Sequence, residues 1–153
     1  NVVSFIDVDA GFHPDLTGEQ NIFINGLLLG MKREEINRKL LKIIRFADIA
    51  QFIDAPFYTY SQGMKLRLGF SVAIHANPDI LIFDEGIGFG DKEFQRRFQS
   101  EINKYLARGK TLLLATHFLP LVMSFCKRVL IMEKGVVVAD GSTSLVNKYF
   151  KYM

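Results

Sequence analysis

The fold is decided by two stretches of sequence, YSQGMKLRL (residues 60–68) and ILIFDE (residues 80–85). In the first, Ser61 can cap a helix that is expected to run to about Ala76, because Asn77-Pro78 ends it. The second begins with a short continuous apolar run, which is typical of a strand buried on both faces of a parallel sheet. A helix followed by such a strand indicates an α/β fold.

The sequence after this strand continues the α/β pattern. Apolar residues at helical spacing predict a helix over residues 92–107, and residues 111–115 supply the next buried strand. The order of strand, helix and strand predicts a right-handed parallel βαβ unit. The last expected elements are a hairpin of residues 128–133 and 136–139 around the turn Lys134-Gly135, and a helix over residues 144–149.

The sequence before the two stretches predicts a short strand and two further helices. Residues 2–6 are apolar and rich in branched side chains, as in a strand. Thr17 and Gln20 form a capping box for a helix over about residues 18–29, and a second, amphipathic helix is expected to continue to about Phe46. The first half of the chain is therefore expected to be mainly helical.

Length and composition limit the class of protein. The chain has 153 residues, of which 49% are hydrophobic and 23% charged, so it suits one globular domain and not a disordered or collagen-like protein. No apolar run approaches the ~20 residues that span a bilayer, and no leader sequence is recognised. The net charge of +3 permits an anionic partner. The single cysteine, Cys126, is interpreted as a core thiol in a reducing compartment.

Two groups of residues suggest phosphate chemistry. Asp84 and Glu85 follow the predicted strand directly, at the end where open parallel sheets bind ligands. In phosphoryl transfer, one carboxylate of such a pair binds Mg²⁺ and the other orients the attacking water; the simpler alternative is an acidic turn. Ser61 and Gly63 begin a helix, where N–H groups, a hydroxyl and the positive end of the helix dipole suit a terminal phosphate.

Together these motifs resemble those of the ATP-binding-cassette (ABC) ATPases. YSQGM (residues 60–64) resembles their signature segment in the form typical of polysaccharide exporters, and Asp84-Glu85 resembles Walker B. GFGD (residues 88–91) is similar to the D-loop and ATH (residues 115–117) to the switch-histidine loop. Residues 11–22 resemble the segment after the glutamine loop in O-antigen and teichoic-acid exporters. A capped helix, an acidic turn and a surface histidine would rarely coincide in this order.

The resemblance implies an α/β, P-loop-NTPase-like cassette fragment: a helical subdomain followed by a parallel βαβ half-core and a C-terminal hairpin and helix. It implies ATP and Mg²⁺ as cofactors. Asp7 takes the position of the glutamine-loop residue, with Asp9 as the alternative alignment. The implied roles are catalytic for Glu85 and His117, nucleotide-binding for Ser61, Gln62, Gly63, Met64 and Asp91, and metal-binding for Asp84 and Asp7.

The same resemblance divides the chain into three parts. Residues 1–16 correspond to the end of the N-terminal core with the glutamine-loop region, residues 17–77 to the helical subdomain with the signature motif, and residues 78–153 to the second half of the catalytic core. No Gly-x-x-x-x-Gly-Lys-Ser/Thr phosphate loop is found, since Gly109-Lys110-Thr111 lies between a helix and a strand instead of the reverse. The chain alone is therefore expected to have no ATPase activity.

The implied function is that of an ATP hydrolase that powers export of a polysaccharide or related glycan. The expected partners are a second ATPase subunit in a homodimer and a membrane permease, at the cytoplasmic face of the inner membrane. Phe12, expected to be exposed in its loop, would help to dock the permease. Two alternatives stay open: a non-transport ABC ATPase acting on nucleic acid or the ribosome, and a noncatalytic truncated interaction module. The signature form favours export, so no nucleic-acid partner is expected.

Overall fold

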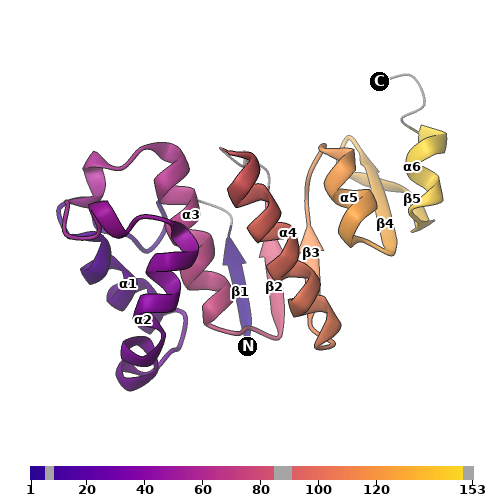
Figure 1. Cartoon of the computed structure of the whole chain (residues 1–153). Coiled ribbons are helices and arrows are strands. Elements are labelled where there is room, and N and C mark those ends of the chain that lie inside the picture. Colours follow the sequence, from indigo (N-terminus) through magenta and orange to yellow (C-terminus); the bar gives the residue numbers. More distant parts are fainter. Residues whose placement is uncertain (6–8, 85–90, 150–153) are drawn as a thin grey trace. The chain divides into compact units, whose positions relative to one another are not determined.

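The computed structural model describes residues 1–5, 9–84 and 91–149 of the chain. The chain forms two compact units, residues 1–113 and 114–153 (Figure 1). Their division lies elsewhere than the functional boundaries expected after residues 16 and 77, which stay predictions.

Three helices form the first part of unit 1: α1 (Gly18–Leu28), α2 (Arg33–Ala47) and α3 (Gln62–His75). The capping box predicted for α1 is present, because the Thr17 hydroxyl accepts from the Gln20 N–H and the Gln20 side chain accepts from the Thr17 N–H. α2 ends at Asp48, which has the left-handed φ of 56°. Two short 3-10 helices, η1 (Ala50–Phe52) and η2 (Phe57–Thr59), lead from α2 to α3.

The three helices share one apolar core, which we call the helical core. Ser71 on α3 is fully buried beside it, and its hydroxyl donates to the Ile43 carbonyl of α2 at 2.8 Å. Each large apolar side chain that is fully buried in the helical core contributes about 1.5–3 kcal/mol, so packing is the main source of stability in this region. The helical core consists of Ile22, Met31, Ile36, Ile43, Ile44, Ala47, Ile49, Phe57, Tyr60, Leu68, Val72 and Ala76.

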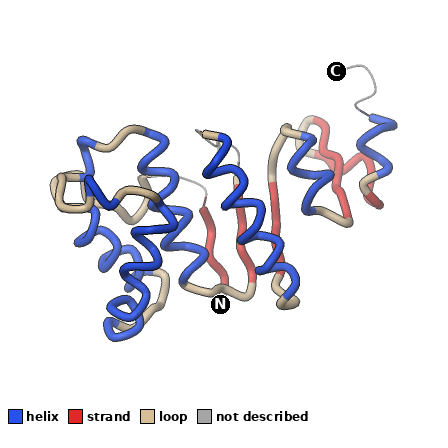
Figure 2. The backbone as a smooth tube through the Cα atoms, viewed as in Figure 1, coloured by secondary structure: helices blue, strands red, loops and turns tan. Residues whose placement is uncertain are grey.

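The sheet of unit 1 lies beside α3. β1 (Val2–Phe5) and β2 (Ile80–Phe83) pair in parallel with Val2 opposite Ile80, and β3 (Thr111–Leu114) pairs with the other side of β2. α4 (Lys92–Ala107) connects β2 to β3, and Figure 2 shows it crossing in front of the strands. The predicted βαβ unit is therefore present, with the third strand supplied from the start of the chain.

An aromatic cluster joins this sheet to α3 and α4. The ring of Phe70 on α3 has its centroid 4.5 Å from that of Phe98 on α4 and 5.7 Å from that of Phe83 on β2. Phe5 on β1 meets Phe83 edge to face at 5.8 Å. α3 carries glycine at position 69, where a Cβ would lie 2.6 Å from the Phe5 ring. α3 is therefore held on one side by the helical core and on the other by the sheet.

Burial of the strands is less complete than expected. β3 was predicted to be a buried strand, but Leu113 is 53% exposed, because β3 is the edge strand of the described sheet. β2 lies between two strands, and Leu81 and Phe83 on one of its faces are fully buried. On the other face Ile80 and Ile82 are only half-buried, so the prediction of burial on both faces is correct for one face only.

Unit 2 contains α5 (Leu119–Phe125), an antiparallel hairpin of β4 (Arg128–Glu133) and β5 (Val136–Ser142), and α6 (Ser144–Tyr149). The hairpin and α6 are confirmed, with β5 three residues longer than the predicted strand. α5 is an element that the sequence does not predict, since the apolar stretch around Cys126 indicates only the surroundings of a core thiol. Cys126, at the end of α5, is half-buried, and burial raises the pKa of its thiol.

The α/β fold class is confirmed in its element order, from helical region through parallel βαβ unit to hairpin and terminal helix. Within the described ranges 1–5, 9–84 and 91–149, no helix combines the length and apolar character needed to cross a membrane.

Candidate functional site at the start of helix α3

The first turn of α3 carries four of the residues assigned to nucleotide binding. Ser61 is the N-cap, and its Oγ accepts a hydrogen bond from the Met64 N–H at 3.3 Å. In the part of the chain that the structure describes, the N–H groups of Gln62 and Gly63 have no acceptor. Ser61 and Gln62 are exposed, so the positive end of this helix faces solvent.

The charge and shape of this helix start differ from those of its neighbours. α1, α2 and α4 each have a glutamate in their first turn, whereas α3 has no acidic residue there. A Cβ placed on Gly63 would meet only Ser61 Oγ, at 4.0 Å. Nothing in the described chain therefore requires glycine at position 63, and the space beside it is open to another molecule. An unneutralised, accessible helix N-terminus suits an anion.

Asp84 stands at the carboxyl edge of the sheet. It directly follows β2, is exposed, and its N–H donates to the Phe5 carbonyl at the end of β1 at 3.4 Å. This is the place expected from the sequence. Its role as a metal ligand stays a prediction.

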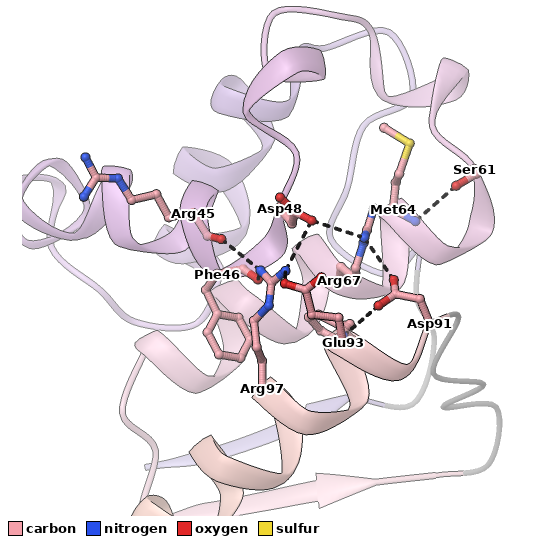
Figure 3. A network of polar contacts seen from close by, with 10 residues as sticks. Arg45, Phe46, Asp48, Ser61, Met64, Arg67, Asp91, Glu93 and Arg97 are labelled. Carbon is pink, nitrogen blue, oxygen red and sulfur yellow. Dashed lines mark hydrogen bonds and ion pairs between the residues drawn. The ribbon is translucent and has the colours of Figure 1, made fainter.

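Asp91 connects the start of α4 to the middle of α3 (Figure 3). One carboxylate oxygen, Oδ1, accepts from the Phe94 N–H at 2.7 Å and thereby caps α4. The other, Oδ2, accepts from Nη1 of Arg67 on α3 at 3.2 Å. The role of Asp91 in nucleotide binding stays a prediction, and the structure adds these two contacts within the chain.

A second arginine ties α4 to the end of α2 (Figure 3). Nη1 of Arg97 lies 3.4 Å from the carbonyl oxygens of both Arg45 and Phe46, in the last turn of α2, where a cation is favourable. Nη2 of Arg97 lies 3.3 Å from Asp48 and 2.7 Å from Glu93. We call Arg67, Arg97, Asp48, Asp91 and Glu93 the arginine network. Sequence reasoning missed all but Asp91, because these residues come from three elements.

Lys65 reaches the opposite side of α3. Its Nζ lies 3.0 Å from Asp9 Oδ1 and 5.0 Å from the centre of the Phe57 ring. Asp9 is the alternative alignment of the glutamine-loop position, and that assignment stays a prediction. α3 therefore contacts the chain on both sides of its first two turns, through Lys65 and through Arg67.

The remaining predicted site residues are placed as follows. Glu85 and Asp7 lie outside the described residues. His117 belongs to unit 2, where it is exposed in the loop between β3 and α5. The described site of unit 1 thus consists of the start of α3 with Asp91 tied to the same helix, and Asp84 at the sheet edge.

The described carboxylates fit the way in which nucleotide enzymes hold Mg²⁺. Among residues 1–5, 9–84 and 91–149, no three His, Cys, Asp or Glu side chains gather into a metal cage. Mg²⁺ in such enzymes keeps several waters and binds one or two carboxylates together with phosphate oxygens. A single exposed carboxylate such as Asp84 suits that mode.

The prediction of an exposed Phe12 is wrong. Its ring stacks on the Phe57 ring with centroids 4.8 Å apart and planes 6° from parallel, and it packs partly buried against the helical core. The loop that carries Phe12 packs against its own domain, because η2 places Phe57 beside the Phe12 ring. Phe12 therefore no longer supports a permease contact.

Comparison with known proteins gives a consistent result. No protein-family model matches the chain. The chain is 39% identical over 153 residues to the ABC transporter protein AbcA of Aeromonas salmonicida and 40% identical over 150 residues to the O-antigen export system ATP-binding protein RfbB of Myxococcus xanthus. It is 40% identical over 151 residues to the teichoic acids export ATP-binding protein TagH of Listeria monocytogenes. These alignments cover 98–99% of this chain but 50%, 34% and 45% of the relatives.

A solved structure described as an ATP-binding subunit of an ABC transporter has the same fold. It superposes with a TM-score of 0.79 at 24% identity, covering 92% of this chain and 58% of that one. The chain thus spans about a third to a half of the length of the curated relatives it matches. Along almost all of its own length, it is homologous to the ATP-binding subunits of ABC transporters.

Proposed function

We propose that this chain supplies the signature helix and the Walker B strand of an ATP-hydrolysing subunit that powers export of a polysaccharide or related glycan. The observation that carries the proposal is the start of α3, which combines a serine cap, an open glycine and no acidic side chain. Such a helix end binds a terminal phosphate. The glycan class is supported by the names of the relatives, which export O-antigen and teichoic acids.

The proposed chemistry is hydrolysis of ATP at the γ-phosphate. Asp84 would hold Mg²⁺, which when bound neutralises charge on the phosphates. Glu85 would take a proton from the attacking water, and His117 would orient that water. The first turn of α3, Ser61 to Met64, would donate hydrogen bonds to the γ-phosphate oxygens, and the products are ADP and phosphate.

The proposed assembly is a homodimer docked on a membrane permease at the cytoplasmic face of the inner membrane. In this arrangement α3 of one subunit closes over ATP that is held by the phosphate loop of the other. The 153 residues contain no sequence that matches such a loop. We therefore propose that the chain by itself hydrolyses no ATP, and the tests below use the complete gene product.

The catalytic role is tested by Glu85→Gln. Turnover should fall by about 10²–10⁴-fold while ATP affinity is retained, because the amide keeps the size of the side chain but cannot accept the proton. Glu133→Gln, which alters an exposed glutamate of the hairpin, is the matched control and should leave turnover unchanged. Unchanged turnover in Glu85→Gln would remove this residue from catalysis.

The role of the helix start is tested by Ser61→Ala combined with Gly63→Asp. The new carboxylate would occupy the open space beside position 63 and repel a phosphate. ATP-dependent dimerisation, followed by sedimentation, should weaken more than ATP binding to the monomer. Equal dimer fractions in variant and parent would contradict the proposed position of α3 over the partner's nucleotide.

A further inference from the structure

His75 is the last residue of α3, at the point where this helix packs against α2. Its imidazole is half-buried, and its Nδ1 lies 2.7 Å from the Ser71 carbonyl oxygen, one turn earlier in the helix. A carbonyl oxygen can only accept, so Nδ1 carries a hydrogen and donates it. The ring also meets the Phe46 ring of α2 edge to face, with centroids 5.8 Å apart. In its neutral form His75 therefore fits an apolar contact between two helices.

Lys39 of α2 holds the same turn of α3. Its Nζ lies 2.7 Å from the carbonyl oxygen of His75 and 2.6 Å from Glu35 Oε1. The last carbonyl groups of a helix have no partner within the helix, so Lys39 caps α3 from its neighbour. Ser71 adds a second link, since its buried hydroxyl donates to the Ile43 carbonyl of α2. The last turns of α3 are therefore hydrogen-bonded to α2 at two points.

The surroundings of the imidazole oppose a positive charge on it. Burial is the largest cause, because it removes water from the charged form. Lys39 and Lys42 on α2 add repulsion, whereas the Ser71 carbonyl within α3 and Glu101 on α4 favour the charged form. The balance lowers the pKa of His75 below its ordinary value of 6.5. The folded chain therefore binds a second proton at this ring less readily than the unfolded chain does.

We propose that His75 makes this junction an acid-sensitive contact, in which protonation of the imidazole releases the last turn of α3 from α2. A proton from water adds to Nε2, and no covalent bond is broken. The new imidazolium repels Lys39, whose ammonium group caps the same turn, and it is fully hydrated only when the ring leaves Phe46. The turn therefore opens locally at low pH and closes again when the pH is raised. This opening does not require ATP hydrolysis.

The opening should follow a defined range of pH. Since the pKa of His75 is lowered in the folded state, the contact is at full strength above the ordinary pKa of 6.5 and weakens as the pH falls through 6.5 toward the lowered value. Between about pH 5.5 and 7.5, histidine is the main side chain that titrates. The 153 residues contain three histidines, His13, His75 and His117, so variants of single histidines assign the effect.

The experiment measures hydrogen-exchange protection of the amides of residues 71–76 in the complete gene product at about pH 5.5 and 7.5, corrected for the intrinsic exchange rate. In the parent, protection should fall severalfold at the lower pH. In His75→Gln it should be the same at both pH values, because glutamine keeps a donor for the Ser71 carbonyl but does not titrate. His13→Gln, in an exposed loop, is the control and should lose protection as the parent does.

Two charge variants test the sign of the effect and also serve if His75→Gln fails to fold. Glu101→Gln removes the anion that favours the imidazolium, so the acid-induced loss of protection should deepen. Lys42→Met removes an opposing cation but leaves the cap by Lys39, so the loss should shrink. No loss in the parent, an equal loss in His75→Gln, or a smaller loss in Glu101→Gln would overturn the proposal. An NMR titration midpoint of the His75 ring at or above 6.5 would do the same.

Discussion

The helical region of unit 1 and the described part of unit 2 are held together by very different amounts of buried apolar surface. The helical core joins three helices through twelve buried side chains. The described part of unit 2 buries only Leu121, Val122, Ile131 and Val146, while its hairpin exposes five large apolar side chains: Leu130, Met132, Val136, Val137 and Val138. A two-stranded hairpin is marginal by itself. We infer that the helical region is the stable part of the chain and that unit 2 unfolds locally at lower cost.

The largest effect is expected for Ile36→Ala in the helical core. The side chain is fully buried on α2, so its loss should lower the free energy of unfolding by about 2–5 kcal/mol, measured by urea denaturation. Leu41→Ala on the same helix is the control and should have little effect, since Leu41 is 64% exposed. Ile131→Ala in unit 2 should cost clearly less than Ile36→Ala. Equal losses of unfolding free energy in Ile36→Ala and Ile131→Ala would contradict the inferred difference in stability between the two regions.

Two glycine substitutions should change stability in opposite directions. In Gly26→Ala the new methyl group would lie 2.9 Å from Ile36 Cδ1, which is fixed in the helical core, so we expect a loss of about 1–3 kcal/mol. In Gly63→Ala the methyl group enters open space within a helix, and we expect a gain of about 0.5–1 kcal/mol. Thermal unfolding of both variants measures this. A loss in Gly63→Ala would mean that glycine is required by the chain itself.

A smaller effect concerns the ionisation of Tyr60. Burial raises the pKa of this phenol to about 12, and nearby Asp54 adds to the shift. Because the folded state favours the neutral phenol, its contribution is complete below pH 10 and is lost as the pH rises from 10 toward 12. Urea denaturation across this range should show a decline that is weaker in Tyr60→Phe. That variant should also lose about 1 kcal/mol at neutral pH, because Tyr60 donates to the Phe52 carbonyl. Tyr58→Phe, at an exposed position, is the control and should decline like the parent.

The smallest effect is expected in unit 2, for Arg128→Gln. Arg128 bonds both carboxylate oxygens of Asp140 across the hairpin, but both residues are exposed, and exposed ion pairs contribute little. The midpoint of the main urea transition should not change. Since Arg128 lowers the pKa of Asp140, any measurable contribution should disappear as the pH falls through that lowered pKa. A clear shift of the main midpoint would show that the hairpin and the helical region unfold together.

What the sequence predicted correctly depends on local interactions. The start of α3 follows from Ser61 and the start of α1 from Thr17 and Gln20, because a cap involves residues three positions apart. The strand before Asp84 follows from an uninterrupted apolar run. These signals located the described parts of the candidate site at the start of α3 and at the sheet edge.

What the sequence did not predict depends on contacts between distant residues. The ring of Phe12 is covered by Phe57, 45 positions away in the chain, and no local pattern indicates that stacking. The exposure of β3 follows from its place at the edge of the sheet. Arg67 has the same surroundings in the sequence as an ordinary helix-surface arginine, and only the fold brings Asp91 to it.

The hydroxyl of Ser61, at the start of α3, can take part in two hydrogen bonds of opposite direction. In the structure Ser61 Oγ is used as an acceptor, by the Met64 N–H. A hydroxyl also carries a proton that it can donate at the same time, whereas a carboxylate can only accept. Ser61 can therefore cap the N-terminus of α3 and donate a hydrogen bond to an anion at the same time. Aspartate at this position would cap the helix equally well but would repel an anion, so a serine cap is the one compatible with the proposed phosphate contact.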